Sequence, residues 1–174
     1  MEQLRRTLRE EGGIADRPAS EDPGGLTNKG ITQKLLNQYR LRHPGEPFPA
    51  SVLDLNPFEV AKLYRRVFWE PCKCDLLPPA LAVVTFDMAV MSGQYVAGFL
   101  VQEALNGGIS VDGWIGPETV RRAQAAFAAG GLARLCLLEK NREDWLKRRK
   151  NFRANPGWIP RTQRNFGFAR QLLA

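Results

Sequence analysis

The sequence predicts a mainly α-helical protein with a small β element near its N-terminus. Apolar residues recur at helical spacing along most of the 174 residues. Asn, Pro and Gly residues mark where these segments begin and end, and strand signals are confined to two short pieces, 26–31 and 109–115. Because the chain shows no internal repeat or long linker, residues 1–174 are expected to form a single compact unit.

The N-terminal half is predicted to contain three helices. The first is short and polar, with Leu4 and Leu8 on one face and glycine from Gly12 onward as its stop. The second is capped by Thr32 and ends before His43.

The third helix has the strongest start signal in the chain, the sequence NPFE from Asn56 to Glu59. Asn is a favoured capping residue, Pro is favoured at the first helical position, and Glu at the third completes the cap. The apolar residues behind it follow helical spacing, and Pro71 ends the segment.

Five more helices are expected in the second half. They cover 80–91, a segment ending at Leu105, a segment from Pro117 to the glycines at 130–131, residues 132–152 and residues 161–173. The first of these is apolar enough to be a buried central helix. Its one carboxylate, Asp87, is expected to bind neighbouring backbone or an arginine, because a buried charge requires a partner.

Composition limits the classes of function. The three cysteines, Cys72, Cys74 and Cys136, suit reduced thiols better than a disulfide framework. With His43 as the only histidine, neither a zinc site nor a Ser-His-Asp triad is well supplied, so no metal and no cofactor is expected.

The N-terminus carries no apolar signal core, and no apolar run approaches the roughly 18 residues of a membrane span. Synthesis in the cytoplasm without a cleaved export signal is therefore expected.

Positive charge is concentrated at the C-terminal end. From Arg134 onward there are 11 Lys/Arg and 3 Asp/Glu, within a chain of net charge +7. A solvated helix face is one interpretation, and a polyanionic partner such as an anionic membrane or wall polymer is the other. Nucleic acid is not expected, because the basic residues are not embedded in a known nucleic-acid-binding motif.

The segment EEGGIADRPASEDPGGLTNKGIT, residues 10–32, places two adjacent glutamates at the mouth of an elaborate loop. Glu11 lies three residues after Leu8 and seven after Leu4, so it shares their apolar face, whereas Glu10 lies opposite. An apolar environment favours the protonated carboxyl that a glycosidase uses as its general acid. A helix-end surface residue is the alternative.

Glycosidic cleavage usually needs a second carboxylate, and the same loop supplies Asp16, Glu21 and Asp22. Asp22 begins the turn DPGG, where a turn-forming role is the ordinary interpretation. Spacing alone leaves both roles for Asp22 open.

This segment resembles the start of the family 108 glycoside hydrolases, an N-acetylmuramidase group, in its EGG, DPGG and GxTxxGIT elements. The resemblance implies a lysozyme-like helical fold whose small β element lies near the catalytic loop. It also implies that Glu11 is the catalytic acid, and that Asp22 and Thr27 position or activate water at the anomeric carbon. The family often has an aromatic residue after EGG, where this chain has Ile14.

Two further stretches, residues 86–120 and 155–165, resemble the peptidoglycan-binding segment and the closing GWxxR element of the same family. The resemblance therefore implies a catalytic lobe at 1–85 and a helical peptidoglycan-binding-like lobe at 86–174. Asp112, Trp114 and Trp158 are the candidate saccharide contacts. For both tryptophans, a structural turn whose indole packs in the core is the more ordinary interpretation.

The resemblance implies a monomeric lysozyme-class endolysin that cleaves the β-1,4 bond between N-acetylmuramic acid and N-acetylglucosamine in peptidoglycan. It would stay in the cytoplasm until a holin-type pore releases it to the periplasmic wall. The positive charge of the C-terminal region, and not the resemblance, predicts an additional contact with the anionic outer membrane. A lytic transglycosylase and a non-catalytic peptidoglycan-binding protein are the alternatives.

Overall fold

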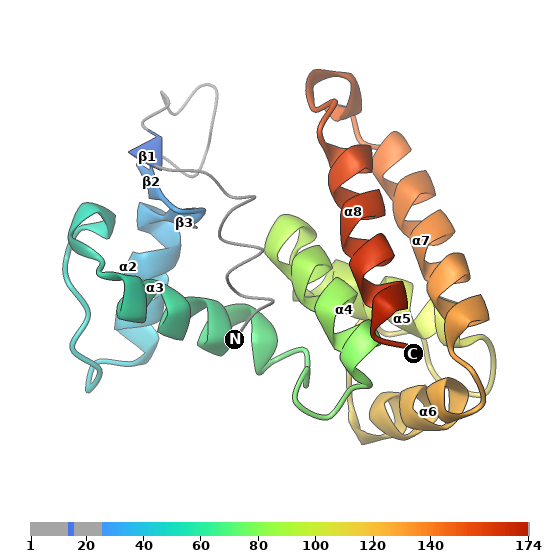
Figure 1. The fold of residues 1–174 in the computed structure, drawn as a ribbon. Coiled ribbons are helices and arrows are strands. Elements are labelled where there is room, and N and C mark those ends of the chain that lie inside the picture. Colours follow the sequence, from blue (N-terminus) through green and yellow to red (C-terminus); the bar gives the residue numbers. More distant parts are fainter. Residues whose placement is uncertain (1–13, 16–25, 174) are drawn as a thin grey trace. The chain divides into compact units, whose positions relative to one another are not determined.

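The computed structural model describes residues 14–15 and 26–173, with side chains described from residue 26 onward (Figure 1). The described part is mainly α-helical with one small sheet, as the sequence predicts. The chain divides into two compact units, Met1–Tyr64 and Arg65–Ala174. The expected lobe boundary at residue 85 falls inside a helix of the second unit, and the functional assignment of the two lobes stays a prediction.

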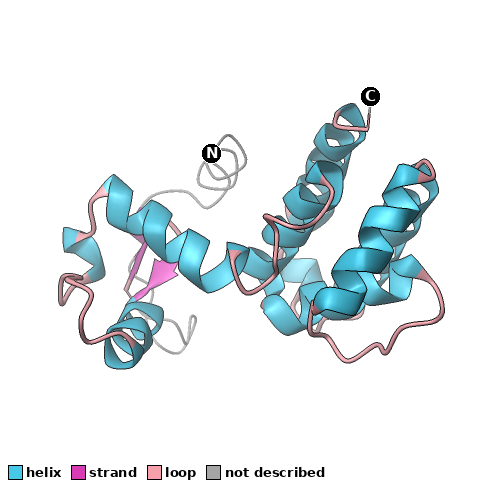
Figure 2. Ribbon diagram, turned by 90° about the horizontal axis from the view of Figure 1, so that it is seen from below, coloured by secondary structure: helices cyan, strands magenta, loops and turns pink. Residues whose placement is uncertain are grey.

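The described part of the first unit combines a three-stranded antiparallel sheet with two α-helices. Its strands are β1 (Ile14–Ala15), β2 (Thr27–Asn28) and β3 (Ile31–Thr32), coloured magenta in Figure 2. The helices are α2 (Gln33–Arg42) and α3 (Pro57–Tyr64), with the short 3-10 helix η1 (Val52–Asp54) between them. Its core is small and apolar, with five fully buried aliphatic side chains: Ile31, Leu36, Val52, Val60 and Leu63.

Local capping explains where these two helices begin. The Thr32 hydroxyl accepts a hydrogen bond from the Leu35 N–H at 3.1 Å. At α3, the Asn56 side chain accepts from the Glu59 N–H at 3.0 Å, and the Glu59 carboxylate accepts from the Asn56 N–H at 2.8 Å. This reciprocal pair is the capping box that the sequence predicts.

The second unit begins with a five-residue π-helix, η2 (Arg65–Trp69), and contains one short 3-10 helix, η3 (Phe152–Ala154); its other described helices are α-helices. Its helices are α4 (Pro79–Ser92), α5 (Gln94–Leu105), α6 (Pro117–Ala128), α7 (Leu132–Lys147) and α8 (Trp158–Gln171). Helices α4 and α7 each contact both α5 and α8, while α6 contacts α5 and α7 (Figure 1). Every residue of α4 from Ala80 to Ala89 is buried, which confirms it as the buried central helix.

A charged cluster lies inside this bundle. Two nitrogens of Arg161 donate to one carboxylate oxygen of Asp87, at 3.0 and 2.7 Å, and both side chains are buried. The arginine partner expected for Asp87 is therefore confirmed. A second buried arginine, Arg142, donates to the Ser92 hydroxyl at 2.7 Å, and burial lowers the pKa of its guanidinium to about 10.

Three boundaries differ from the sequence prediction. The piece 109–115 forms an irregular loop with bends rather than a strand, α7 ends at Lys147 rather than at residue 152, and α8 begins at Trp158 rather than at residue 161. The predicted first helix, through Leu4 and Leu8, lies outside the described residues. Among the helices that are described, none has the length and apolar character of a membrane span.

Candidate active site and saccharide-binding surfaces

Of the three candidate catalytic residues, Thr27 lies within the described part of the chain, and Glu11 and Asp22 lie outside it. Thr27 is half-buried in the central strand β2, where it pairs with Ala15 of β1 and Thr32 of β3. The turn from β2 to β3 has two residues, Lys29 and Gly30, with φ of 47° and 77°. A tight two-residue hairpin turn of this type requires positive φ angles at both of its residues, which glycine adopts readily. The turn that ends at Gly30, the first residue of the GIT element, therefore sets the position of Thr27 in the preceding strand.

Three side chains that the sequence did not single out hold this hairpin. Asn28 donates its side-chain amide to the Val52 carbonyl at 2.8 Å, and the Tyr64 hydroxyl donates to the Lys29 carbonyl at 2.8 Å. Gln33 bridges to the η1 region through the Ala50 carbonyl at 2.7 Å and the Val52 N–H at 2.9 Å. A buried backbone group without a hydrogen-bond partner costs free energy. These bonds therefore hold the backbone beside Thr27 in place.

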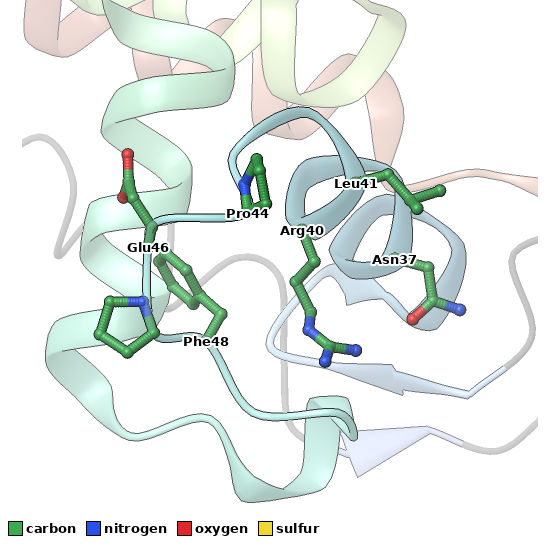
Figure 3. Close-up of a pocket in the computed structure, with 7 residues that line it drawn as sticks. Asn37, Arg40, Leu41, Pro44, Glu46 and Phe48 are labelled. Atoms are coloured by element: carbon green, nitrogen blue, oxygen red, sulfur yellow. The ribbon is translucent and has the colours of Figure 1, made fainter.

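The first unit also has an open hollow of about 670 Å³ between α2 and the loop that follows it (Figure 3). Arg40 and Asn37 project from α2, and Phe48 lies across from Arg40. Glu46 is the carboxylate that lines the hollow. It forms an ion pair with the Lys62 ammonium at 2.6 Å and accepts a hydrogen bond from the Tyr39 hydroxyl at 3.2 Å. Thr27, the predicted catalytic residue that the structure describes, does not line this hollow.

In the second unit, Asp112 lies in a loop that is anchored by Gln102 of α5. The buried Gln102 amide donates to the Asp112 carboxylate at 2.9 Å and to the Trp114 carbonyl at 3.0 Å, and its oxygen accepts from the Gly113 N–H at 2.7 Å. The hydrogen bond from Gln102, followed by that from the Trp114 N–H, lowers the pKa of the Asp112 carboxyl. Asp112 is therefore ionised near neutral pH and is an acceptor at the surface.

Trp114 is 65% exposed, so the interpretation that its indole packs in the core is wrong. Tyr95, 55% exposed, lies against the same loop, since a Cβ on Gly113 would meet its ring at 2.5 Å. The loop approaches α5 closely because position 98 is glycine, where a Cβ would lie 2.1 Å from the Gly113 carbonyl oxygen. Together Tyr95, Asp112 and Trp114 form an exposed aromatic surface beside a carboxylate, which we call the α5 platform.

Trp158, the third candidate saccharide contact, is half-buried at the first turn of α8. Its carbonyl accepts from the Thr162 hydroxyl at 2.9 Å. Within the described residues, no hydrogen bond or ring contact connects Trp158 with the α5 platform. The structure therefore brings Asp112 and Trp114 together in one loop. Trp158 makes no hydrogen bond or ring contact to either of them in the described part of the chain.

The other reactive groups of the described chain have structural environments. Burial raises the pKa of the Cys72 thiol to about 12 and also raises that of Cys74, so both thiols stay protonated near neutral pH. The His43 ring stacks on Tyr39 with centroids 4.4 Å apart. In the part of the chain with described side chains, no three His, Cys, Asp or Glu residues gather as metal ligands would.

Residues 4–93, just over half of the chain, match the family described as Glycosyl hydrolase 108. Among solved structures, SagA of Brucella abortus matches with a TM-score of 0.82 and 28% sequence identity, over 99% of this chain and 94% of that chain. No curated protein matches the chain. The family match contains Glu11, Asp22 and Thr27, and the structural match extends through both compact units.

Proposed function

Since the chain belongs to the glycosyl hydrolase 108 family, we propose that it hydrolyses the β-1,4 bond between N-acetylmuramic acid and N-acetylglucosamine in peptidoglycan. The observation that carries this proposal is the family match over residues 4–93, which includes all three candidate catalytic residues.

In this proposal, Glu11 protonates the oxygen of the leaving sugar. Asp22, with Thr27, orients a water molecule or stabilises positive charge at the anomeric carbon. The fixed hairpin supports the role of Thr27, because a hydroxyl that positions water must itself be held in place, and the bonds from Asn28 and Tyr64 hold the backbone on both sides of the turn.

The α5 platform is proposed to bind the glycan strand. The exposed indole of Trp114 offers a flat apolar face to a sugar ring, and ionised Asp112 accepts hydrogen bonds from sugar hydroxyls. Trp158 is proposed as a separate, weaker contact, because it is only half-exposed at the start of α8.

We further propose an endolysin role for the monomer. The enzyme would be released from the cytoplasm through a holin-type pore and would act on the periplasmic wall. The exposed basic residues Lys147–Lys150 at the end of α7 support an accompanying contact with anionic outer-membrane lipid, since they carry four adjacent positive charges.

The test is mass spectrometry of soluble fragments from purified Gram-negative peptidoglycan, treated with wild type, Glu11→Gln or Glu10→Gln. Muropeptides with reducing muramic acid ends should appear with wild type and fall by at least about 100-fold with Glu11→Gln, because a general acid contributes on the order of 10²–10⁴. Glu10→Gln is the matched control, since helical periodicity puts Glu10 on the opposite face, and it should keep most of the activity.

Anhydro-muramic ends would instead identify a lytic transglycosylase. Tight peptidoglycan binding without any released fragment would identify a binding protein and contradict the proposed hydrolysis.

A further inference from the structure

A second hollow of the second unit, about 340 Å³, lies between α5 and α7. Its lining combines aromatic and aliphatic side chains with charges of both signs: Phe99, Leu100 and Glu103 from α5, and Asn141, Asp144, Trp145, Arg148 and Arg149 from α7 and its C-terminal end. We call it the α5–α7 groove.

The charges of the α5–α7 groove are not paired with one another. Within the described residues, the carboxylates of Glu103 and Asp144 make no ion pair and accept no hydrogen bond. Arg148 donates its Nε to the backbone carbonyl of Asp144 at 3.0 Å, and the Arg149 guanidinium lies over the Trp145 ring at 4.2 Å. Both guanidiniums therefore keep N–H donors for a ligand.

The carboxylates on the other faces of α7 are engaged. Glu143 pairs with Lys147 at 3.2 Å and accepts from Gln163 at 3.0 Å, and Glu139 pairs with Arg170. Among the carboxylates of α7, the one without a partner in the described part of the chain is therefore Asp144, which lines the hollow. Two acids and two guanidiniums beside an apolar wall complement a ligand that carries carboxylates, an ammonium group and methylenes between them.

The groove and the α5 platform lie on adjacent faces of one helix. On one face of α5, Gly98 and Gln102 contact the Asp112–Trp114 loop. The residue that follows each of them, Phe99 after Gly98 and Glu103 after Gln102, lines the groove. Successive helical residues point about 100° apart. A polymer held on the platform would therefore present its substituents to the neighbouring groove.

We propose that the α5–α7 groove binds the stem peptide of peptidoglycan. Arg148 and Arg149 bind its carboxylates, Glu103 and Asp144 bind the free ammonium of its diamino acid, and Phe99 and Trp145 cover the methylene chain. This inference rests on the proposed function, in that it takes peptidoglycan as the substrate, and it extends recognition from the sugars to the peptide.

The experiment is calorimetric titration of the full chain with the tripeptide L-Ala-γ-D-Glu-meso-diaminopimelate, which contains no glycosidic bond. We expect saturable binding that weakens about three- to tenfold in Arg149→Gln and in Glu103→Gln. Glu118→Gln and Arg121→Gln are the matched controls, because they remove the same charges from an exposed pair on α6 outside the groove. They should leave the affinity unchanged.

A second ligand tests the acidic side of the groove. The same tripeptide acetylated on its free side-chain amine should bind wild type more weakly, and Glu103→Gln should no longer change its affinity. No saturable binding by wild type, or equal losses in the α6 controls, would overturn the proposal. Because the tripeptide is not cleaved, this result is independent of fragment release from whole peptidoglycan, which tests the proposed hydrolysis separately.

Discussion

The two compact units fix their polar groups in different ways. In the first unit, where each strand has two residues, side chains such as Asn28 and Tyr64 bond directly to backbone carbonyls around the β2–β3 hairpin. In the second unit, long helices satisfy their own backbone, and the buried polar groups include the ion pair of Asp87 and Arg161 and the Gln102 amide that anchors the Asp112–Trp114 loop. In the proposed function, the first arrangement would hold Thr27 in place for catalysis, and the second would support the α5 platform for binding.

The chain offers a spectroscopic way to separate the two units. All four tryptophans lie in the second unit, at positions 69, 114, 145 and 158. Tryptophan fluorescence therefore follows unfolding of the second unit, while far-UV circular dichroism follows the helices of both.

The largest expected effect is from Asp87→Asn. The substitution removes the buried carboxylate charge that accepts two hydrogen bonds from Arg161 and that favours the charged form of Arg142. Removal of one partner from a buried ion pair costs about 3–5 kcal/mol, and we expect the free energy of unfolding to fall by that amount. Urea denaturation followed by tryptophan fluorescence measures it.

Arg142→Met is the control for Asp87→Asn. It removes the arginine that makes no hydrogen bond to the Asp87 carboxylate and leaves the Asp87–Arg161 pair complete. Because this change relieves the burial of a charge, the free energy of unfolding should stay level or rise by about 1 kcal/mol. If Arg142→Met lowered the free energy of unfolding as much as Asp87→Asn, side-chain packing would determine stability at this cluster, and the pairing of the buried charges would not.

A smaller effect is expected from Asn28→Ala in the first unit. The buried Val52 carbonyl would lose its donor, at a cost of about 1–3 kcal/mol. Amide hydrogen exchange of residues 26–33 should become faster, and release of muropeptides should fall because Thr27 is less well held. Tryptophan fluorescence should keep its wild-type urea midpoint, and an equal shift of that midpoint would mean that the two units unfold together.

The smallest effect on stability is expected from Trp114→Ala. An indole that is 65% exposed contributes little to the core, so the free energy of unfolding should change by less than about 0.5 kcal/mol. Loss of an aromatic contact worth about 0.5–1.5 kcal/mol should weaken binding to insoluble peptidoglycan about three- to tenfold in a sedimentation assay. Leu132→Ala, which truncates another half-exposed side chain of this unit, should leave binding unchanged.

Local signals in the sequence predict the helices well. The cap at Asn56, the apolar run that becomes α4 and the arginine partner of Asp87 all follow from residue type and spacing, because capping and burial act within a few residues or along one face. The motifs from Glu11 to Thr27 likewise identify the family without any structure.

Long-range contacts explain what the sequence mispredicts. The piece 109–115 has apolar residues that suggest a strand, yet its backbone bonds to the Gln102 side chain of a preceding helix and forms an irregular loop. Nothing near position 112 in the sequence marks Gln102 as the anchor, because the two residues meet only when α5 and the loop pack together.

The sequence by itself determined the helical fold class, the order of the motifs and the candidate acid, because each depends on neighbouring residues. Only the tertiary structure decided that Trp114 is exposed and that unpaired charges gather between α5 and α7. Exposure and pairing depend on which distant elements cover a side chain, and here the close approach at Gly98 and the bonds from Gln102 turn the loop outward.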